Sequence, residues 1–358
     1  MKILFYINTI SHGGAERVMV NLATDLSERG HACRLVTSFR TPKFEYPVSK
    51  KVERTALTDR RVGNPIIRNV KYIILLRSEI KRFNPDVVIS FMPQPNFRTL
   101  LATRGLKTKT IISVRNDPNR EYRGLIRKLF AKILYKRSDG IVFQTEDAKE
   151  WFPQSIRNKG IIIFNQVDER FYNTTLSDKR KDIVAVGSLS SQKNHRTLID
   201  AYANVCGTLE DRLLIFGEGV LRDKLQAQID AYHLEERVRL MGVTPDVPNA
   251  IRTAKLYVLS SDFEGMPNAL MEAMAIGLPC LSTDCPCGGP KTLFGDVLKN
   301  YLVPVNDDQM MGRKIKELLE DDDIREEVGR LCKKKAEEFR PHAIIEKWEN
   351  YINEVATK

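Results

Sequence analysis

Residues 256–276 read LYVLSSDFEGMPNALMEAMAI, and this stretch decides the fold. The apolar run 256–260 predicts a buried strand, and residues 269–276 have the composition of a helix. Between them, Gly265 lets the backbone approach a ligand closely, and Pro267 suits the first position of a helix. Because ligands of open α/β sheets bind at the carboxyl ends of the strands, this unit predicts a binding site at its loop.

Two carboxylates flank the start of this helix. Glu264 lies in the loop after the strand and Glu272 lies over a turn inside the helix, with seven residues between them. The free amides of a helix start bind phosphate. Carboxylates on either side of such a start are suited to hold the hydroxyl groups of a sugar nucleotide. Glutamates at this spacing also arise by chance in many helices, so the pair depends on its context for this interpretation.

A second strand, loop and helix begin the chain. Residues 2–7 are an apolar run typical of a strand, and residues 18–26 have helical spacing. The loop between them contains His12, Gly13 and Gly14, and glycine allows an amide to face a diphosphate without a Cβ in the way. The dinucleotide pattern G-x-G-x-x-G is absent, so this loop by itself also fits an ordinary turn.

The two signals together resemble glycosyltransferase family 4, whose members are retaining enzymes of the GT-B fold. The resemblance covers nearly the whole chain and rests on an ordered set of motifs, each of which is weak alone. These are GGAER at 13–17, VGSLSSQKN at 186–194, FGEG at 216–219, MGV at 241–243, the spaced glutamates and the segment 284–290. The most similar members add hexoses or hexosamines to lipid-linked oligosaccharides in bacteria.

The composition indicates an ordinary globular chain. Its 358 residues suit two domains, and 42% of them are hydrophobic. No apolar run is long enough to span a bilayer, and the first one is too short for a secretion signal. The six cysteines have neither disulfide-scaffold nor zinc-site spacing. We therefore expect a reduced, cytoplasmic protein.

The net charge of +11 is spread unevenly. Residues 1–175 contain 32 basic and 16 acidic side chains, whereas the remainder contains 25 and 30. Such asymmetry predicts an anionic partner that meets only the first half, either nucleic acid or an anionic membrane. Because the basic half has no zinc-finger spacing and no ribonucleoprotein signature, we favour the inner face of the cell membrane and expect no nucleic acid.

Strands and helices alternate along both halves of the chain, which predicts α/β architecture with parallel sheets. Two Rossmann-like, doubly wound domains facing a cleft, the GT-B arrangement, fit this alternation. The expected helices of the first half cover 69–83 and 123–136. The expected strands are 3–7, 32–37, 87–91, 110–114 and 140–144, then 183–187, 213–216, 238–241, 256–260 and 279–282.

Three parts of the chain are expected. By resemblance, residues 1–168 form an acceptor-binding domain and residues 169–340 form a nucleotide-sugar-binding domain. The polar run 174–182 has the composition of a linker. Residues 341–358 contain an apolar helical stripe that includes Trp348, and the resemblance implies that this last helix returns to the first domain.

The resemblance implies roles for the donor-site residues. Glu264 and Lys193 are the expected catalytic residues: Glu264 positions the transferred sugar, and Lys193 stabilises the charge that grows on the leaving diphosphate. Glu272 accepts hydrogen bonds from the ribose, and Val243 lines the slot for the base. The other expected donor contacts are Gly13, Gly14, Ser188, Gly265, Met266, Asn268 and Ala269. For Lys193, a lysine on a surface loop is the alternative.

Two positions depart from the family pattern. Ser188 stands where members usually have arginine, and Arg115 stands where many have histidine. Arg115 cannot act as a base because a guanidinium stays protonated. It could replace the lost positive charge or bind an acceptor phosphate, and an inactive family member is a further alternative.

The segment 120–137 is basic and amphipathic. Arg123, Arg127 and Lys128 accompany an apolar stripe, and such a helix lies on anionic lipid or binds a lipid diphosphate. A helix docked on its own domain, with a solvated basic face, is the alternative. The basic segment 69–83 is a second candidate of this kind, for which we favour the interpretation as plain structure.

The predicted function is retaining transfer of a hexose or N-acetylhexosamine from a UDP-linked donor to a polyprenyl-diphosphate glycan, in bacterial polysaccharide assembly at the membrane periphery. No cofactor and no catalytic metal are expected, since Asp321, Asp322 and Asp323 fit a charged surface. A sugar-nucleotide epimerase is the alternative enzyme, and it would make product from donor alone. A non-catalytic sugar-nucleotide or lipid-binding subunit would bind donor without transfer or hydrolysis.

Overall fold

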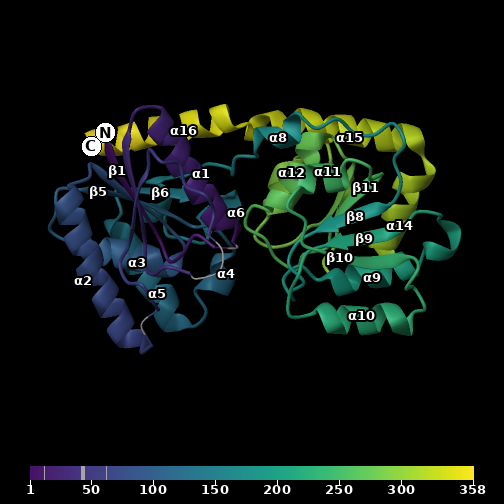
Figure 1. The fold of residues 1–358 in the computed structure, drawn as a ribbon, viewed down its shortest axis with the longest axis horizontal. Coiled ribbons are helices and arrows are strands. Elements are labelled where there is room, and N and C mark those ends of the chain that lie inside the picture. The colour runs from purple at the N-terminus through teal and green to yellow at the C-terminus, as the bar shows by residue number, and fades with distance from the viewer. Residues whose placement is uncertain (12, 42–44, 62) are drawn as a thin grey trace. The chain divides into compact units, whose positions relative to one another are not determined.

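The computed structural model describes residues 1–11, 13–41, 45–61 and 63–358. It divides into two compact units (Figure 1). Unit 1 comprises Met1–Gln166 and His342–Lys358, and unit 2 comprises Val167–Pro341. Unit 1 is therefore built from two separate stretches of the chain.

Unit 1 contains a seven-stranded sheet in the order β3-β2-β1-β4-β5-β6-β7, and its neighbouring strands pair in parallel. The chain moves from β1 outward to β3 and then starts again at β4 on the other side of β1. The strands are β1 Lys2–Ile7, β2 Ala32–Thr37, β3 Glu53–Ala56, β4 Val87–Phe91, β5 Lys109–Ser113, β6 Gly140–Phe143 and β7 Gly160–Ile162.

Helices cover both faces of this sheet because successive side chains of each strand point to opposite faces. On one face, Ile3 and Phe5 belong to a buried cluster with α1 (Gly14–Glu28) and α16 (Pro341–Thr357). On the other face, Leu4 and Tyr6 pack with residues of α2 (Pro65–Phe83) and α3 (Pro93–Ala102). Next to α3 lies α5 (Leu125–Leu134). The short helices of this unit are α4 Pro118–Glu121, α6 Glu146–Glu150 and α7 Gln154–Arg157.

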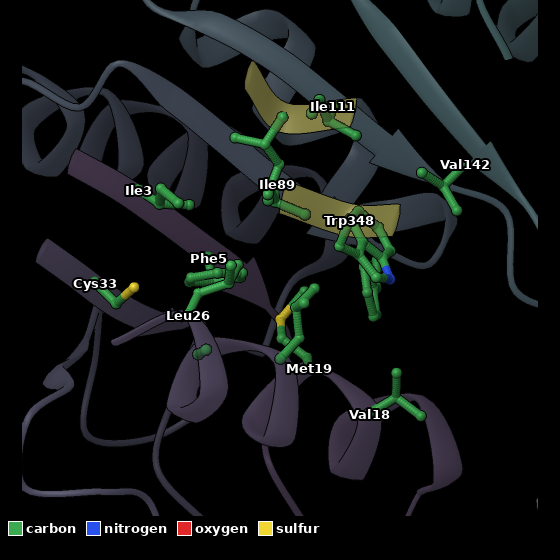
Figure 2. Close-up of a cluster of buried hydrophobic side chains, with 14 of the residues drawn as sticks. Ile3, Phe5, Val18, Met19, Leu26, Cys33, Ile89, Ile111, Val142 and Trp348 are labelled. Atoms are coloured by element: carbon green, nitrogen blue, oxygen red, sulfur yellow. The ribbon is translucent and has the colours of Figure 1, made fainter. Parts of the chain in front are cut away.

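The last helix completes the core of unit 1. Trp348 of α16 is buried, and Figure 2 shows it among Met19, Ile89 and Val142. Its ring centroid lies 5.9 Å from that of Phe91. The hydroxyl of Tyr351 accepts a hydrogen bond of 2.8 Å from the backbone of the sheet at Ile141. Residues 342–358 are therefore an integral part of unit 1.

Unit 2 contains a six-stranded parallel sheet in the order β10-β9-β8-β11-β12-β13. The direction of winding reverses between β8 and β11, which pair side by side. The strands are β8 Ile183–Val186, β9 Leu213–Phe216, β10 Val238–Gly242, β11 Leu256–Leu259, β12 Cys280–Thr283 and β13 Leu302–Val303.

The helices of unit 2 form two groups. Helix α9 (His195–Ala203) packs against α10 (Arg222–Ala231) and α14 (Asp308–Glu320). Helix α12 (Asn268–Ile276) packs against α15 (Asp322–Ala336) and α8 (Glu169–Tyr172). The remaining helices are α11 Val247–Ile251 and α13 Gly289–Phe294.

The predicted α/β class with two parallel sheets is confirmed, and each predicted strand lies within about one residue of an observed strand. Three short strands, β3, β7 and β13, were not predicted. Helix α12 starts at Asn268, so Pro267 precedes the helix instead of occupying its first position.

Two expected boundaries are wrong. Helix α5 begins at Leu125 because Gly124 precedes it with φ of 86°, so Arg123 lies outside the helix. The run 174–182 is not a linker between the units, since it lies within unit 2. There Ser177 and Lys181 donate backbone hydrogen bonds to the carbonyls of Arg252 and Thr253, at 3.0 and 2.8 Å.

No helix within the described part of the chain is both long enough and apolar enough to cross a bilayer.

Candidate active site

The candidate site lies in unit 2, at the carboxyl ends of β8 and β11. These strands are apolar and largely buried, and each one leads through a loop into a helix. The loop after β8 contains Ser188 and Lys193, and the loop after β11 contains Glu264. Because β8 and β11 are parallel neighbours at the point where winding reverses, their loops emerge at the same edge of the sheet.

The carboxylate of Glu264 is at the centre of this edge. It is 5% exposed. Its Oε1 accepts hydrogen bonds from the Nζ of Lys193 at 2.5 Å and from the Oγ of Ser261 at 2.8 Å. Its Oε2 lies 3.4 Å from the Nε2 of Gln192. A cation, a hydroxyl and an amide therefore fix this carboxylate in one orientation.

The backbone around the ion pair is also held. The Oγ of Ser260 donates to the carbonyl of Lys193 at 3.0 Å, which ties the β8 loop to the end of β11. The amide of Glu264 donates to the carbonyl of Pro286 at 2.6 Å, and the carbonyl of Glu264 accepts from the amide of Cys287 at 2.9 Å. The segment after β12 thus supports the glutamate, which explains why 284–290 belongs to the motif set.

Ser188 carries no charge, and the nearby His195 does not supply a positive charge in its place. Ser188 is exposed, and its Oγ lies 3.0 Å from the Oγ of Ser190. His195, at the start of α9, is buried. Burial, with the nearby charge of Lys193, lowers the pKa of His195 to about 4. The imidazole is therefore neutral near pH 7, and Lys193 is the cation of this loop.

The glycine motif at 216–219 is explained by contact between backbones. Gly217 has φ of 146°, and a Cβ at this position would lie 1.9 Å from the carbonyl oxygen of Gly187. The amide of Gly187 donates to Phe216 at 2.9 Å, and the amide of Gly217 donates to Gly242 at 2.8 Å. The loops after β8, β9 and β10 therefore stack directly on one another. Val243, the residue predicted to line the base slot, follows Gly242 and is 74% exposed.

Glu272 and the start of α12 lie close to the same strand. Glu272 is 6% exposed. Burial raises the pKa of Tyr257 in β11, and the charges of Glu272 and Glu264 raise it further, so both carboxylates act on one buried phenol. The other predicted donor contacts lie around the start of α12. Gly265 and Met266 are buried, and Asn268 and Ala269 are half-buried.

In unit 1, the paired glycines begin helix α1. Gly13 precedes the helix with extended backbone, and its carbonyl accepts from the amide of Arg17 at 3.1 Å. Gly14 is the first helical residue. His12 lies outside the described residues. The donor-binding role of Gly13 and Gly14 stays a prediction.

Arg115 is a buried cation. It is 7% exposed, and its guanidinium donates to the Oδ1 of Asn165 and lies 4.3 Å from the ring centroid of Phe91. Burial lowers its pKa to about 9. Its binding of an acceptor phosphate stays a prediction.

The basic segment after Arg115 has an exposed apolar stripe. Arg123 and Arg127 are exposed and Lys128 is half-buried. Only Ala131 and Leu134 of α5 are buried, whereas Leu125 and Leu129 are 86% and 61% exposed. Helix α5 packs on its own domain through Ala131 and Leu134, as in the docked alternative, but it also exposes its apolar stripe. Lipid binding by this helix stays a prediction.

Comparison with known proteins identifies the family. A model of Glycosyltransferase Family 4 matches residues 12–171, and a model of Glycosyl transferases group 1 matches residues 167–335. The chain belongs to glycosyltransferase family 4. This confirms the resemblance, and it makes the protein a glycosyltransferase. The two matched regions correspond closely to unit 1 and unit 2.

Two relatives of this glycosyltransferase are similar over nearly their full length. It is 29% identical over 354 residues to the N-acetylgalactosamine-N,N'-diacetylbacillosaminyl-diphospho-undecaprenol 4-alpha-N-acetylgalactosaminyltransferase of Campylobacter jejuni, covering 94% of this chain and 95% of the relative. It is 25% identical over 362 residues to the amylovoran biosynthesis glycosyltransferase AmsD of Erwinia amylovora, covering 98% and 99%.

Solved structures share the fold of this glycosyltransferase. HepE of Anabaena, in complex with UDP, has a TM-score of 0.82 at 17% identity and covers 99% of this chain and 100% of its own. The apo form of the lipopolysaccharide outer core galactosyltransferase WaaB has a TM-score of 0.76 at 21% identity and covers 99% of each chain. These likenesses confirm the GT-B fold.

Two residues that hold Glu264 were not predicted as site residues from the sequence of this glycosyltransferase. Gln192 stands directly before Lys193, and Ser261 stands three residues before Glu264. Their proximity to the predicted site was a usable signal. Their hydrogen bonds were not predictable, since these depend on how the two loops meet.

Proposed function

We propose that this glycosyltransferase moves a hexose or N-acetylhexosamine, with retention of configuration, from a UDP-sugar to a glycan on polyprenyl diphosphate in bacterial glycan assembly. The observation that carries the donor half is the Lys193–Glu264 ion pair at the sheet edge of unit 2. The acceptor class is supported by the Campylobacter jejuni relative, whose name specifies a diphospho-undecaprenol substrate. The complex of HepE with UDP supports the donor class.

In the free protein, the cation and the carboxylate neutralise each other. A bound diphosphate carries more negative charge than one carboxylate, so Lys193 turns toward it when the donor enters. Glu264 stays in place because Ser261 and Gln192 still hold it. Its freed oxygen then accepts hydroxyl hydrogens from the sugar, and charge-assisted hydrogen bonds of this kind are strong.

Lys193 assists the reaction through the leaving group. As the bond from the anomeric carbon to the diphosphate oxygen breaks, negative charge grows on that oxygen, and a fixed cation stabilises it most in the transition state. The acceptor oxygen bonds to the anomeric carbon on the same face, and the departing phosphate takes the acceptor proton. The backbone amides of Gly265, Asn268 and Ala269 contact the donor. Glu272 binds the ribose, and Val243 contacts the base.

Unit 1 supplies the acceptor contacts in this proposal. Arg123, Arg127 and Lys128 bind the phosphates of the lipid carrier or of neighbouring anionic head groups, since polybasic segments are attracted to anionic lipid. The protein then acts at the cytoplasmic face of the cell membrane without spanning it.

A transfer assay tests the proposal. Purified protein is incubated with radiolabelled UDP-glucose, UDP-GlcNAc or UDP-GalNAc and with a polyprenyl-diphosphate disaccharide, and the lipid product is separated and its anomeric configuration determined. We expect a product with the donor's α configuration from at least one sugar. Inverted product would contradict retention. Epimerised donor formed without acceptor would identify an epimerase, and donor binding without transfer or hydrolysis would identify a binding subunit.

A further inference from the structure

Helix α5 exposes a continuous apolar stripe. Leu125, Ile126, Leu129 and Ile133 follow the spacing i, i+1, i+4, i+8, which places them on one side of a helix. Together with Phe130 they are between 45% and 86% exposed. A helix of a globular domain ordinarily turns such a stripe toward the core. In α5 the stripe faces away from the core.

Helix α2 repeats this pattern. Ile66, Ile67, Val70 and Ile74 have the same spacing and are between 52% and 77% exposed. The second half of α2 is ordinary, since Leu76, Ile80 and Phe83 belong to the core. The second half of 69–83 therefore fits the interpretation as plain structure, whereas Val70 and Ile74 at its beginning are exposed. Of the fifteen large apolar side chains exposed among the described residues, nine belong to α2 and α5.

The two stripes flank one helix. Arg98 of α3 donates to the Oδ1 of Asn69 in α2 at 2.8 and 3.0 Å. The neighbouring Phe97 contacts Phe130 of α5, with ring centroids 5.0 Å apart. Consecutive residues of α3 thus touch the first half of α2 and the middle of α5, and Figure 1 shows the three helices in the same part of unit 1. The stripes belong to one region of unit 1.

This region is purely basic. Residues 60–78 and 122–138 contain no Asp or Glu. The first segment contains Arg60, Arg61, Arg68, Lys71 and Arg77, and the second contains Arg123, Arg127, Lys128, Lys132, Lys136 and Arg137. Apolar side chains in segments whose only charged residues are basic are complementary to a surface that offers anionic groups above hydrocarbon.

We propose that α2 and α5 together insert their apolar stripes into an anionic phospholipid surface. This inference rests on the proposed function for its biological setting. It adds α2 to the lipid-binding surface, and it adds insertion of apolar side chains to the contact between basic residues and lipid phosphates. The leucines and isoleucines enter the acyl boundary, while Arg and Lys extend their long side chains to the lipid phosphates. Two stripes on separate helices also restrain the orientation of unit 1 on the membrane, because a single stripe meets the bilayer along one line, about which the domain can rock.

The charge argues against a second copy of the chain as the occupant of this region. A two-fold interface brings the same patch of both subunits together. The basic residues of one copy would then face those of the other without any carboxylate in either segment to compensate, and such like-charge juxtaposition is costly.

Vesicle flotation tests the insertion. The full chain is mixed with vesicles of phosphatidylethanolamine, phosphatidylglycerol and cardiolipin, or of phosphatidylcholine alone, without nucleotide. We expect flotation with the anionic vesicles. The variant Ile67→Gln with Ile126→Gln removes one apolar side chain from each helix and leaves every charge, and we expect its bound fraction to fall about tenfold or more. Val297→Gln is the control, since Val297 is an exposed apolar residue of unit 2.

Depth is measured separately. Ile67→Trp and Ile126→Trp are each expected to show a blue-shifted emission with anionic vesicles and quenching by brominated lipid. The added indole of Val297→Trp should show neither change when vesicles are added, beyond the response of the unsubstituted protein. Quenching at position 126 alone, or flotation unchanged in the double Gln variant, would overturn the two-helix insertion. So would a dimer that the double Gln variant converts to monomer with unchanged flotation. UDP binding and sugar transfer that persist without flotation would refute this inference while leaving the proposed function intact.

Discussion

At the scale of single residues, one ion pair sets the charge of the candidate donor site. Lys193 and Glu264 stand 71 residues apart in sequence, and their side chains meet at 2.5 Å. The motifs predict both residues, but their pairing follows from the parallel neighbours β8 and β11, which the sequence does not reveal. Removing one partner of a pair that is largely screened from water leaves an uncompensated charge. Single substitutions at this pair are therefore informative.

Glu264→Gln is expected to lower the turnover number of sugar transfer about tenfold or more while the fold persists. The amide keeps the size of the side chain but loses the charge that holds Lys193 and the sugar hydroxyls. Initial rates at saturating donor measure turnover, and a thermal melt checks the fold. Glu210→Gln, at an exposed glutamate of the same unit, is the control. Wild-type turnover in Glu264→Gln would remove this residue from the mechanism.

Glu121 predicts a dependence of stability on pH. Burial, with the charge of Asp117, raises the pKa of Glu121 to about 8 from 4.5, and its Oε2 has no hydrogen-bond partner among the described residues. The folded state thus holds this proton more tightly than the unfolded state. The stabilisation is complete below pH 4.5 and is lost as the pH rises through about 8.

Glu121→Gln imitates the protonated carboxyl at every pH. We expect a melting temperature at pH 8.5 that is higher than that of the unsubstituted protein by a few degrees, and nearly equal values at pH 5. Thermal melts at both pH values measure this difference. Glu150→Gln, at an exposed glutamate of the same unit, shows no such pH-dependent gain. An equal change at both pH values would indicate a cause other than titration.

At the scale of elements, apolar runs were enough to predict the central strands of both sheets. The missed strands have weaker signals: β3 has only exposed or half-buried residues, and β13 has two residues. Helical spacing also predicted the apolar stripe of α5, but the face that meets the core is set by tertiary packing against α3. Sequence periodicity tells that a stripe exists and does not tell what covers it.

Gly217 holds the loops of three strands together, which makes a Cβ there costly. Gly217→Ala is expected to destabilise unit 2 by about 2 kcal/mol or more, because the methyl group would overlap the carbonyl oxygen of Gly187 and the backbone has positive φ. In a unit of this size, we expect the melting temperature to fall by roughly 4–8 °C. UDP affinity, measured by calorimetry, should fall as well.

Gly207→Ala is the matched control for this substitution. A Cβ at Gly207 would meet nothing within 4 Å. Its melting temperature and UDP affinity should stay close to those of the unsubstituted protein. A stable Gly217→Ala variant with normal UDP affinity would show that the loops after β8 and β9 can move apart without loss of stability or binding.

At the scale of the whole molecule, the proposed donor and lipid contacts belong to different units. Unit 2 carries Lys193 and Glu264, and unit 1 carries the basic, apolar surface of α2 and α5. Residues that bind lipid should therefore be separable from residues that bind nucleotide. The charge asymmetry between the two halves of the sequence already predicted this separation, whereas the segment 69–83 of α2 was a candidate that the sequence did not favour.

Arg127→Glu with Lys128→Glu is expected to weaken binding to anionic vesicles about tenfold or more and to leave UDP affinity unchanged. Reversal places two carboxylates where the lipid phosphates would lie. Flotation and calorimetry measure the two affinities. Lys333→Glu with Lys334→Glu makes the same charge change at exposed positions of unit 2 and should alter neither. Equal vesicle affinity in the first variant would contradict the basic contact of α5.

The return of α16 to unit 1 has a consequence for synthesis on the ribosome. Unit 2 is contained within residues 167–341, so all of its sequence has been translated before the codon for Trp348 is read. Unit 1 cannot receive that indole until residue 348 leaves the exit tunnel. Every residue of unit 2 is therefore made before unit 1 can be completed, and the nascent first sheet must wait for its last helix with one apolar face uncovered.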